Sequence, residues 1–319
     1  MDRITIIEMC KGVDIKMDLV SIIIPTHNGS EHIINALKSA LNQCYKNIEI
    51  IIVDDNGKNT IEQLKTQSVI EPFLKDKRIK YIVHDVNMNG SAARNTGFRN
   101  SRGEYITLLD DDDEYLPNKV MDQVNEFSKL DKNWGMVYCG ATHRAFNKSG
   151  NLLYDLLLHS VVIGSNSLMV RRSIFEKLNG FDESFKRHQD YEFTARVANI
   201  TNIKCVKSIG FIYNAEVGRN KNKSIDIAQE HRKHYIDKML PLIIKFPVSK
   251  QKIIICSNSM EVVSIYLREG KIITFYKELK KFAEQWDIKI GFNTILYTSV
   301  MKILRKLDRS PYKNAEEWR

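Results

Sequence analysis

The stretch Tyr105-Ile106-Thr107-Leu108-Leu109-Asp110-Asp111-Asp112-Asp113 joins a short, largely apolar run to four consecutive aspartates. A run of this length and composition is typical of a buried strand. Four adjacent carboxylates repel one another and favour no regular element, so we expect them just past the end of the strand. This stretch therefore predicts a buried sheet with a strongly charged site at one edge.

The same alternation of strand and helix extends back to residue 19. Strands are predicted at 19–25, 48–53, 79–83 and 105–109, and helices at 31–43, 61–74, 91–100 and 118–130. The strands are apolar on both faces, which indicates an α/β fold with a mostly parallel central sheet covered by helices on both sides. In such open sheets, ligands bind at the carboxyl ends of the strands.

A divalent cation would relieve the repulsion among the four aspartates, because Mg²⁺ and Mn²⁺ prefer carboxylate oxygens together with substrate phosphates. Residues two apart in extended backbone share a face, so Asp110 is expected beside Asp112, and Asp111 beside Asp113. The alternative is a solvated acidic turn or a helix N-cap.

Two other strand ends carry polar side chains, in Pro25-Thr26-His27-Asn28 and in Asp54-Asp55-Asn56. A carboxylate after the second strand can accept hydrogen bonds from a base or a ribose. The alternative is an Asx turn, since Asp-Asn-Gly is a strong turn sequence.

Arg94 and Asp190 are candidates whose local sequence leaves two interpretations open. Arg94 follows small residues that open a helix, where backbone N–H groups and a guanidinium can bind phosphate. The alternative is an ordinary helix cap with a surface arginine. Asp190 begins a helix beside aromatic residues and can serve as a general base or as an N-cap.

Composition excludes several classes of protein. The chain has 319 residues, 43% of them hydrophobic and 27% charged, with 15 Gly and 6 Pro, which excludes a disordered or collagen-like chain. No stretch approaches 18 apolar residues, and residues 1–16 lack the apolar core of a signal peptide. The five cysteines stand far apart without a C-x-x-C motif, which argues against a zinc ribbon or disulfide scaffold and favours the cytoplasm.

Together and in order, these segments resemble family 2 glycosyltransferases, the inverting group with the GT-A fold, of the type that builds bacterial capsular and other surface polysaccharides. The resemblance covers about residues 19–215. It rests on Val20–Asn28 (V-S-I-I-I-P-T-H-N), Glu49–Asp55 (E-I-I-I-V-D-D), Gly90–Gly97 (G-S-A-A-R-N-T-G), Gly103–Asp113 (G-E-Y-I-T-L-L-D-D-D-D), Gly180–Glu183 (G-F-D-E) and Gln189-Asp190.

The resemblance implies a role for each matching position and a metal-dependent transfer from a UDP-sugar. Pro25, Thr26 and Asp54 correspond to positions that bind the uracil and the nucleoside, with Asn28 and Asp55 supporting them, and Arg94 contacts the nucleotide. Asp110, Asp111 and Asp112 match the D-x-D region, in which Asp111 faces ribose or sugar and Asp112 holds Mn²⁺ or Mg²⁺. Asp190 matches the catalytic base, which deprotonates an acceptor hydroxyl.

Two departures from the family pattern bear on the site. The family usually has Glu before the base, whereas this chain has Gln189, so the base lacks a neighbouring charge. The turn after Asp55 carries Lys58 where the family has small polar residues, which leaves the preference for the base of the nucleotide open.

The resemblance also divides the chain. Residues 1–18 are a leader; 19–215 are the catalytic domain, with a nucleotide-sugar-binding half at 19–130 and an acceptor-binding half at 131–215; and 216–319 are a helical, basic C-terminal region. Residues 1–215 hold 27 basic and 27 acidic side chains, so the formal net charge of +9 comes entirely from 216–319.

The composition of the C-terminal region indicates which partners the protein can bind. Residues 291–309 have apolar residues at helical spacing with lysines and arginines beside them, which fits a helix lying on an anionic membrane near a lipid-linked acceptor. Packing on the core or in a homodimer is the alternative. The expected location is the cytoplasm, on the inner face of the cell membrane if this helix lies on the membrane. No nucleic-acid binding is expected, because the tail lacks interleaved surface aromatics.

Two other functions are alternatives to glycosyl transfer to a glycan or lipid-linked acceptor. A sugar nucleotidyltransferase requires a Gly-rich, basic phosphate loop after the first strand, which Ile24–Gly29 lacks. A catalytically inactive sugar-nucleotide-binding subunit does not require Asp112 and Asp190, and both are present.

Overall fold

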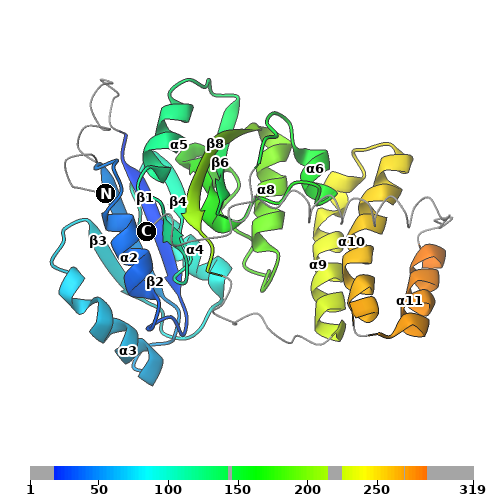
Figure 1. Cartoon of the computed structure of the whole chain (residues 1–319), viewed down its shortest axis with the longest axis horizontal. Coiled ribbons are helices and arrows are strands. Elements are labelled where there is room, and N and C mark those ends of the chain that lie inside the picture. Colours follow the sequence, from blue (N-terminus) through cyan, green and yellow to red (C-terminus); the bar gives the residue numbers. More distant parts are fainter. Residues whose placement is uncertain (1–17, 143–145, 215–224, 269, 286–319) are drawn as a thin grey trace.

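The computed structural model describes residues 18–142, 146–214, 225–268 and 270–285. Within these ranges the strands form one eight-stranded sheet, in the order β3-β2-β1-β4-β7-β6-β8-β5 (Figure 1). The strands are β1 (Val20–Thr26), β2 (Ile48–Asp54), β3 (Ile79–Val83), β4 (Tyr105–Leu108), β5 (Glu114–Tyr115), β6 (Trp134–Ala141), β7 (Leu168–Arg171) and β8 (Asn202–Ile212).

The mostly parallel sheet predicted from the strand composition is confirmed. β1 pairs in parallel with β2 and β4, β2 pairs in parallel with β3, and β6 pairs in parallel with β8. β7 runs antiparallel between β4 and β6, and the short β5 runs antiparallel to β8. The parallel half is the part built from the alternating strands and helices of residues 20–108.

Helices cover both faces of this sheet. They are α2 (Ile33–Leu41), α3 (Ile61–Ile70), α4 (Gly90–Arg99), α5 (Lys119–Phe127), α6 (Leu153–Leu157), α7 (Arg172–Lys177), α8 (Gln189–Ile200), α9 (Ile225–Ile243), α10 (Val248–Arg268) and α11 (Ile272–Gln285), with 3₁₀ turns η1 (Glu71–Phe73) and η2 (Ser165–Ser167). Successive side chains of a strand point to opposite faces. Accordingly, Ile22 and Ile24 join the core under α2 and α5, whereas Ile23 joins the core under α7 and α8.

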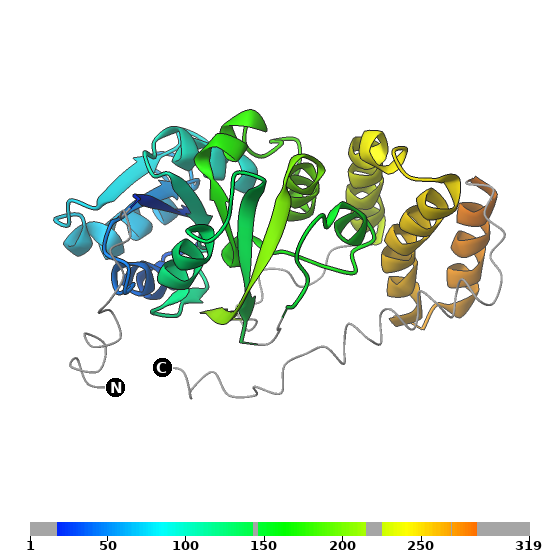
Figure 2. The ribbon, with the colours of Figure 1, turned by 90° about the horizontal axis from the view of Figure 1, so that it is seen from above.

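The three C-terminal helices form a layer at one end of the molecule, beside α6 and α8 (Figure 1 and Figure 2). Tyr235 and Ile243 of α9 and Ile254 of α10 are fully buried or nearly so, and they belong to the same apolar cluster as Phe193 of α8. The first two of these helices are therefore packed on the sheet domain through shared core.

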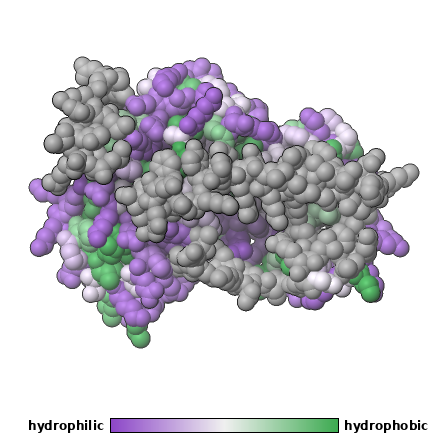
Figure 3. Space-filling model, viewed as in Figure 1, coloured by the Kyte–Doolittle hydropathy of each residue, from purple (hydrophilic) through white to green (hydrophobic). Residues whose placement is uncertain are grey.

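The face shown in Figure 3 is largely hydrophilic where it is coloured, with apolar residues gathered over α3 at the lower left. Ile61 and Leu64 of this helix are 72% and 53% exposed. Apolar side chains exposed singly are normal on a protein surface. In the part of the chain that the structure describes, no helix is both long enough and apolar enough to cross a bilayer.

The structure differs from the predicted elements chiefly at the end of one helix and at one long strand, and the short elements β5 and α6 were not predicted either. The predicted helix 61–74 ends as an α-helix at Ile70 and continues as the 3₁₀ turn η1, because Pro72 cannot donate the next helical hydrogen bond. The long strand β8 was not predicted at all, although Ile203 and Cys205 alternate with partly exposed neighbours. The amphipathic segment predicted at 291–309 lies outside the described residues.

Candidate active site

The parallel register brings three strand ends to one edge. Thr26 of β1 pairs with Asp54 of β2, and Leu108 at the end of β4 pairs with Ile23. Beyond β4 the chain turns back toward β1, where Thr26 Oγ1 donates a hydrogen bond of 2.5 Å to Asp111 Oδ2. The structure therefore brings together predicted residues from three separate strands.

The approach of Asp111 to Thr26 depends on Gly29. A Cβ added at Gly29 would lie 1.8 Å from Asp111 Oδ2 and 2.5 Å from Thr26 Oγ1. Pro25 precedes Thr26 and pairs with Val53. The loop after β1 is also joined to the loop after β2, since the N–H of Asn28 donates to Asn56 Oδ1 at 2.8 Å.

Asp54 is fully buried at the end of β2. Its Oδ1 accepts from the backbone N–H and from Nδ2 of Asn56 at 3.0 and 2.8 Å, and its Oδ2 accepts from the Tyr81 hydroxyl at 2.7 Å. The Asx turn weighed for this sequence is therefore present. Burial raises the pKa of the Asp54 carboxyl, against the lowering effect of these donors.

Asp55 lies on the other side of the same turn and joins β2 to the start of α4. Its carboxylate accepts from His84 Nδ1 at 2.7 Å and from the N–H groups of Met88 and Asn89 at 2.7 and 2.9 Å. His84 follows β3 directly, so the fourth parallel strand also contributes to this edge. Asp55 acts here as a positioning residue for the loop that enters α4.

Arg94 is 5% exposed, so the alternative prediction that it is a surface arginine is wrong. Its Nη2 donates to Asp110 Oδ1 at 2.6 Å. The start of α4 is capped by Asn89 Oδ1, which accepts from the N–H groups of Ser91 and Ala92 at 2.9 and 3.2 Å. Those N–H groups are occupied by the cap, so in this conformation the Arg94 guanidinium, rather than the helix start, is the group suited to a phosphate.

The four aspartates form a turn closed by a 3.2 Å hydrogen bond from the N–H of Asp113 to the carbonyl of Asp110. They are not an N-cap, since α5 begins only at Lys119. Asp111 and Asp113 are buried, whereas Asp110 and Asp112 are partly exposed, in keeping with the predicted alternation.

Asn166 and Asn214 hold this turn. Asn166 Oδ1 accepts from the N–H of Asp110 at 2.6 Å, and Asn166 Nδ2 donates to carboxylate oxygens of Asp110 and Asp113. The N–H of Asn214 donates to Asp113 Oδ1 at 2.8 Å, and Asn214 Nδ2 donates to the carbonyl of Asp112. Burial, with the charge of its neighbouring aspartates, raises the pKa of Asp113 to about 8.

The donor set of this turn fits an open divalent-metal site. Across the described residues, no group of three or more His, Cys, Asp or Glu side chains is arranged to enclose a metal ion. Mg²⁺ is usually held by one or two carboxylates together with substrate phosphates rather than by a protein cage. The crowded carboxylates, with Asp110 and Asp112 partly exposed, suit that arrangement.

Asp190 is the second residue of α8, whose N-cap is His188, so Asp190 is not the N-cap. Its Oδ1 accepts from the N–H of Tyr191 at 3.0 Å. Burial raises the pKa of Asp190 to about 6, the nearby Arg94 guanidinium opposes that shift, and the charge of Asp110 adds to it. Asp190, Arg94 and Asp110 are therefore close enough to interact electrostatically.

The loop before α8 is fastened to α4. Asn95 Nδ2 donates to the carbonyl of Phe181 at 2.9 Å, and the N–H of Phe181 donates back to Asn95 Oδ1 at 2.8 Å. Ser91 Oγ donates to the carbonyl of Phe185 at 3.1 Å. The helix that carries Arg94 thus also positions the chain that leads to Asp190.

Among the residues of this site that were not predicted from the sequence are Gly29, Tyr81, His84, Asn166 and Asn214. The position of His84 directly after a parallel strand was a usable signal, because the same rule identified the other strand ends. Asn166 lies between Ser165 and Ser167 just before β7, in no recognisable motif. Tyr81 points from β3 to Asp54, which only the sheet order reveals.

A comparison with known proteins agrees with this geometry. Residues 21–183 match the family model described as glycosyl transferase family 2. An uncharacterized glycosyltransferase of Rickettsia prowazekii is 28% identical over 309 residues, which covers 90% of this chain and 92% of the relative. The Escherichia coli protein WfgD, named UDP-Glc:alpha-D-GlcNAc-diphosphoundecaprenol beta-1,3-glucosyltransferase, is 28% identical over 199 residues, or 61% of this chain and 75% of WfgD.

Among solved structures, the mannosyltransferase PcManGT of Pyrobaculum calidifontis, in complex with GDP-Man and Mn²⁺, superposes with a TM-score of 0.56. It is 15% identical, and the match covers 93% of this chain and 90% of PcManGT. At that identity the likeness shows the fold, which is GT-A.

Proposed function

The chain belongs to glycosyltransferase family 2, and from this premise we propose that it transfers a sugar from a UDP-sugar to a hydroxyl of a glycan or lipid-linked acceptor, with inversion at the anomeric carbon. The observation that carries the proposal is that Arg94 donates a hydrogen bond to Asp110 of the aspartate turn and acts electrostatically on Asp190. One cation thereby interacts both with the turn where a diphosphate would lie and with the carboxylate that would activate the acceptor.

On the donor side, each predicted residue has a role that its contacts support. Asp54 and Thr26, with Pro25, Asn28 and Asp55 around them, form the polar edge proposed for the uracil and ribose. Asp111 is held against Thr26, where it can accept from a ribose or sugar hydroxyl. Asp54 keeps unused acceptor capacity, because a carboxylate has about four lone-pair sites.

The aspartate turn is proposed to hold the diphosphate with a divalent cation. Asp112 would bind Mn²⁺ or Mg²⁺, and Asp110 would support it beside Arg94. The cation, when bound, supplies charge stabilisation to the departing nucleoside diphosphate. Arg94 adds a guanidinium, which suits phosphate oxygens.

On the acceptor side, Asp190 is the proposed general base. Its carboxylate takes the proton of the acceptor hydroxyl as that oxygen attacks the anomeric carbon and the bond to UDP breaks. The attack comes from the face opposite the leaving group, so an α-linked donor gives a β-linked product. A pKa of about 6 leaves the group mostly ionised at neutral pH yet basic enough to accept a proton.

The class of acceptor and the cellular location are also part of the proposal. The name of WfgD supports an acceptor on a lipid diphosphate. A role in surface polysaccharide synthesis is part of the same proposal. We propose that the transfer reaction takes place at the inner surface of the cell membrane. The chain would then consist of a leader at 1–18, a catalytic domain at 19–215 and a basic region at 216–319 that contacts anionic lipid or a second subunit.

The proposed function is tested by incubating the protein with a panel of UDP-, GDP- and TDP-sugars, with and without Mn²⁺, and measuring release of nucleoside diphosphate. We expect slow, metal-dependent hydrolysis of one UDP-sugar. Hydrolysis of a GDP-sugar and of no UDP-sugar would show that the donor is a GDP-sugar. Absence of both hydrolysis and UDP–Mn²⁺ binding would reject the assignments of Asp54 and Asp110–Asp112.

A further inference from the structure

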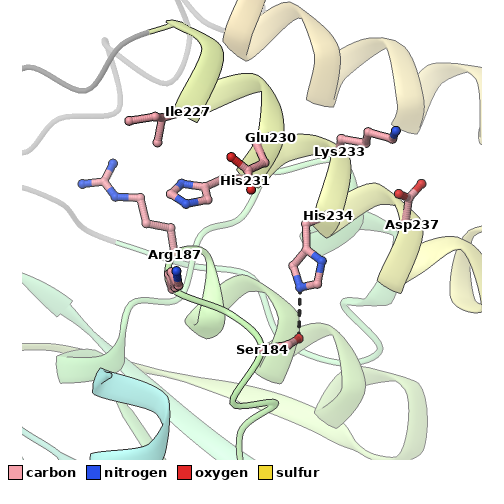
Figure 4. A pocket seen from close by; sticks show the side chains of 9 residues that line it. Ser184, Arg187, Ile227, Glu230, His231, Lys233, His234 and Asp237 are labelled. Carbon is pink, nitrogen blue, oxygen red and sulfur yellow. Dashed lines mark hydrogen bonds between the residues drawn. The ribbon is translucent and has the colours of Figure 1, made fainter. Parts of the chain in front are cut away.

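A cavity of about 580 Å³, lined mostly by charged residues and histidines, lies between residues 184–187 and one face of α9 (Figure 4). In that view Arg187 reaches from the loop toward α9, where His231 and Ile227 lie opposite it, and His234 points down to Ser184. None of the residues assigned to donor binding lines this cavity.

The walls of the cavity are fixed to each other. Ser184 Oγ and His234 Nε2 are 3.0 Å apart, and Lys238 of α9 forms a 2.8 Å ion pair with Asp182. On its other side, the loop is bonded to α4 through Ser91. The loop that forms one wall of the cavity is therefore bonded both to α4 and to α9.

The cavity also lies close to the proposed base. Arg187 precedes Asp190 by three residues, and three residues of fully extended chain span at most about 11 Å. An acceptor whose hydroxyl meets Asp190 can therefore place another of its groups near Arg187. The opposite side of the loop is bonded to α4, so the cavity lies on the side of the loop away from that helix.

The charges of the cavity indicate what that group is. The loop contributes Lys186 and Arg187, and α9 contributes Lys233, His231 and His234. Two carboxylates, Glu230 and Asp237, oppose these five nitrogen-bearing side chains. A guanidinium with nearby ammonium and imidazole groups matches the oxygens of a phosphate ester.

We propose that this cavity binds the phosphate or diphosphate group of the acceptor while the acceptor hydroxyl lies at Asp190. The inference rests on the proposed function, since it assigns the acceptor to a substrate class, and it makes Lys186 and Arg187 determinants of acceptor specificity. The phosphate ester can belong to a lipid carrier or to a soluble sugar phosphate.

The test measures binding of three probes by calorimetry, in EDTA and saturating UDP: inorganic pyrophosphate, farnesyl diphosphate and farnesol. We expect wild-type protein to bind both diphosphates and not farnesol. The double variant Lys186→Glu/Arg187→Glu should bind both diphosphates at least about tenfold more weakly. Tighter binding of farnesyl diphosphate than of pyrophosphate would identify a lipid carrier; equal binding would identify a soluble ester.

Lys77→Glu is the matched control, because Lys77 is an exposed lysine before β3, at the other end of the molecule. It should bind the diphosphates like the wild type. Lys186→Ala, at an exposed position, replaces the double variant if that protein does not fold. Equal binding by the wild type and the charge variants, no binding by the wild type, or equal binding of farnesol would each overturn the proposal.

The proposed function is measured separately, by slow release of UDP from a UDP-sugar without acceptor. The cavity variants should bind UDP–Mn²⁺ like the wild type, because they leave the donor residues intact. If the wild type binds diphosphates through Lys186 and Arg187 but hydrolyses no UDP-sugar, the cavity assignment stands and the proposed donor fails.

Discussion

The guanidinium of Arg94 donates a 2.6 Å hydrogen bond to Asp110 while it also lowers the pKa of Asp190 on a different helix. Arg94 is almost completely buried, so these carboxylates are electrostatically linked through a cation with little access to solvent. A change of charge at Arg94 or Asp110 is therefore expected to change the pKa of Asp190.

Replacing Arg94 tests this linkage. Arg94→Ala removes a positive charge that favours the ionised form of Asp190, so the pKa of Asp190 should rise. The acidic limb of the rate–pH profile for nucleoside diphosphate release should then move to higher pH, and the rate at neutral pH should fall at least about tenfold. Arg99→Ala, on the exposed end of α4, is the control and should leave the profile unchanged.

The wild-type profile is itself a prediction. Asp190 must be ionised to accept a proton, and its pKa is raised to about 6. Turnover should therefore rise with pH through a midpoint near 6 and level off above it. A midpoint near the ordinary aspartate value of about 4 would contradict the assignment.

Gly29 tests the packing of Asp111 against Thr26. In Gly29→Ala the new methyl group would collide with both side chains, so Asp111 must move. We expect donor affinity to fall at least about tenfold and stability to fall by about 1–3 kcal/mol. Gly164→Ala is the control, since a Cβ there meets no atom within 4 Å; equal effects of both substitutions would contradict this role.

Asn166 is predicted to hold the aspartate turn in its binding conformation. Asn166→Ala removes hydrogen bonds to Asp110 and Asp113, each worth about 0.5–1.5 kcal/mol. UDP–Mn²⁺ affinity, measured by calorimetry, should weaken at least about tenfold. Asn199→Ala, at the far end of α8, should bind like the wild type.

The sequence predicted the parallel half of the fold because each of its strands is apolar on both faces. It also predicted the residues that follow β1, β2 and β4, since the carboxyl ends of parallel strands share an edge. His84, after β3, obeys the same rule and was missed because a single histidine carries little signal alone. The long strand β8 was missed because its Lys204, Lys207 and Ser208 interrupt the apolar pattern.

Other parts of the site depend on tertiary structure. Asn166 reaches the aspartates only because β7 inserts antiparallel beside β4. The cavity at Arg187 exists only because α9 folds back against the loop before α8. Neither relationship has a local signature, since the partners are 56 residues apart for Asn166 and Asp110, and 50 for Ser184 and His234.

The central claim, that this family 2 enzyme uses Asp190 as its base, is tested most directly by Asp190→Asn. Release of nucleoside diphosphate and calorimetric binding of UDP–Mn²⁺ should be measured in parallel, with Asp131→Asn, in an exposed loop between α5 and β6, as the control. We predict that Asp190→Asn loses at least about 100-fold in turnover with UDP binding unchanged. Unchanged turnover in Asp190→Asn would contradict the account.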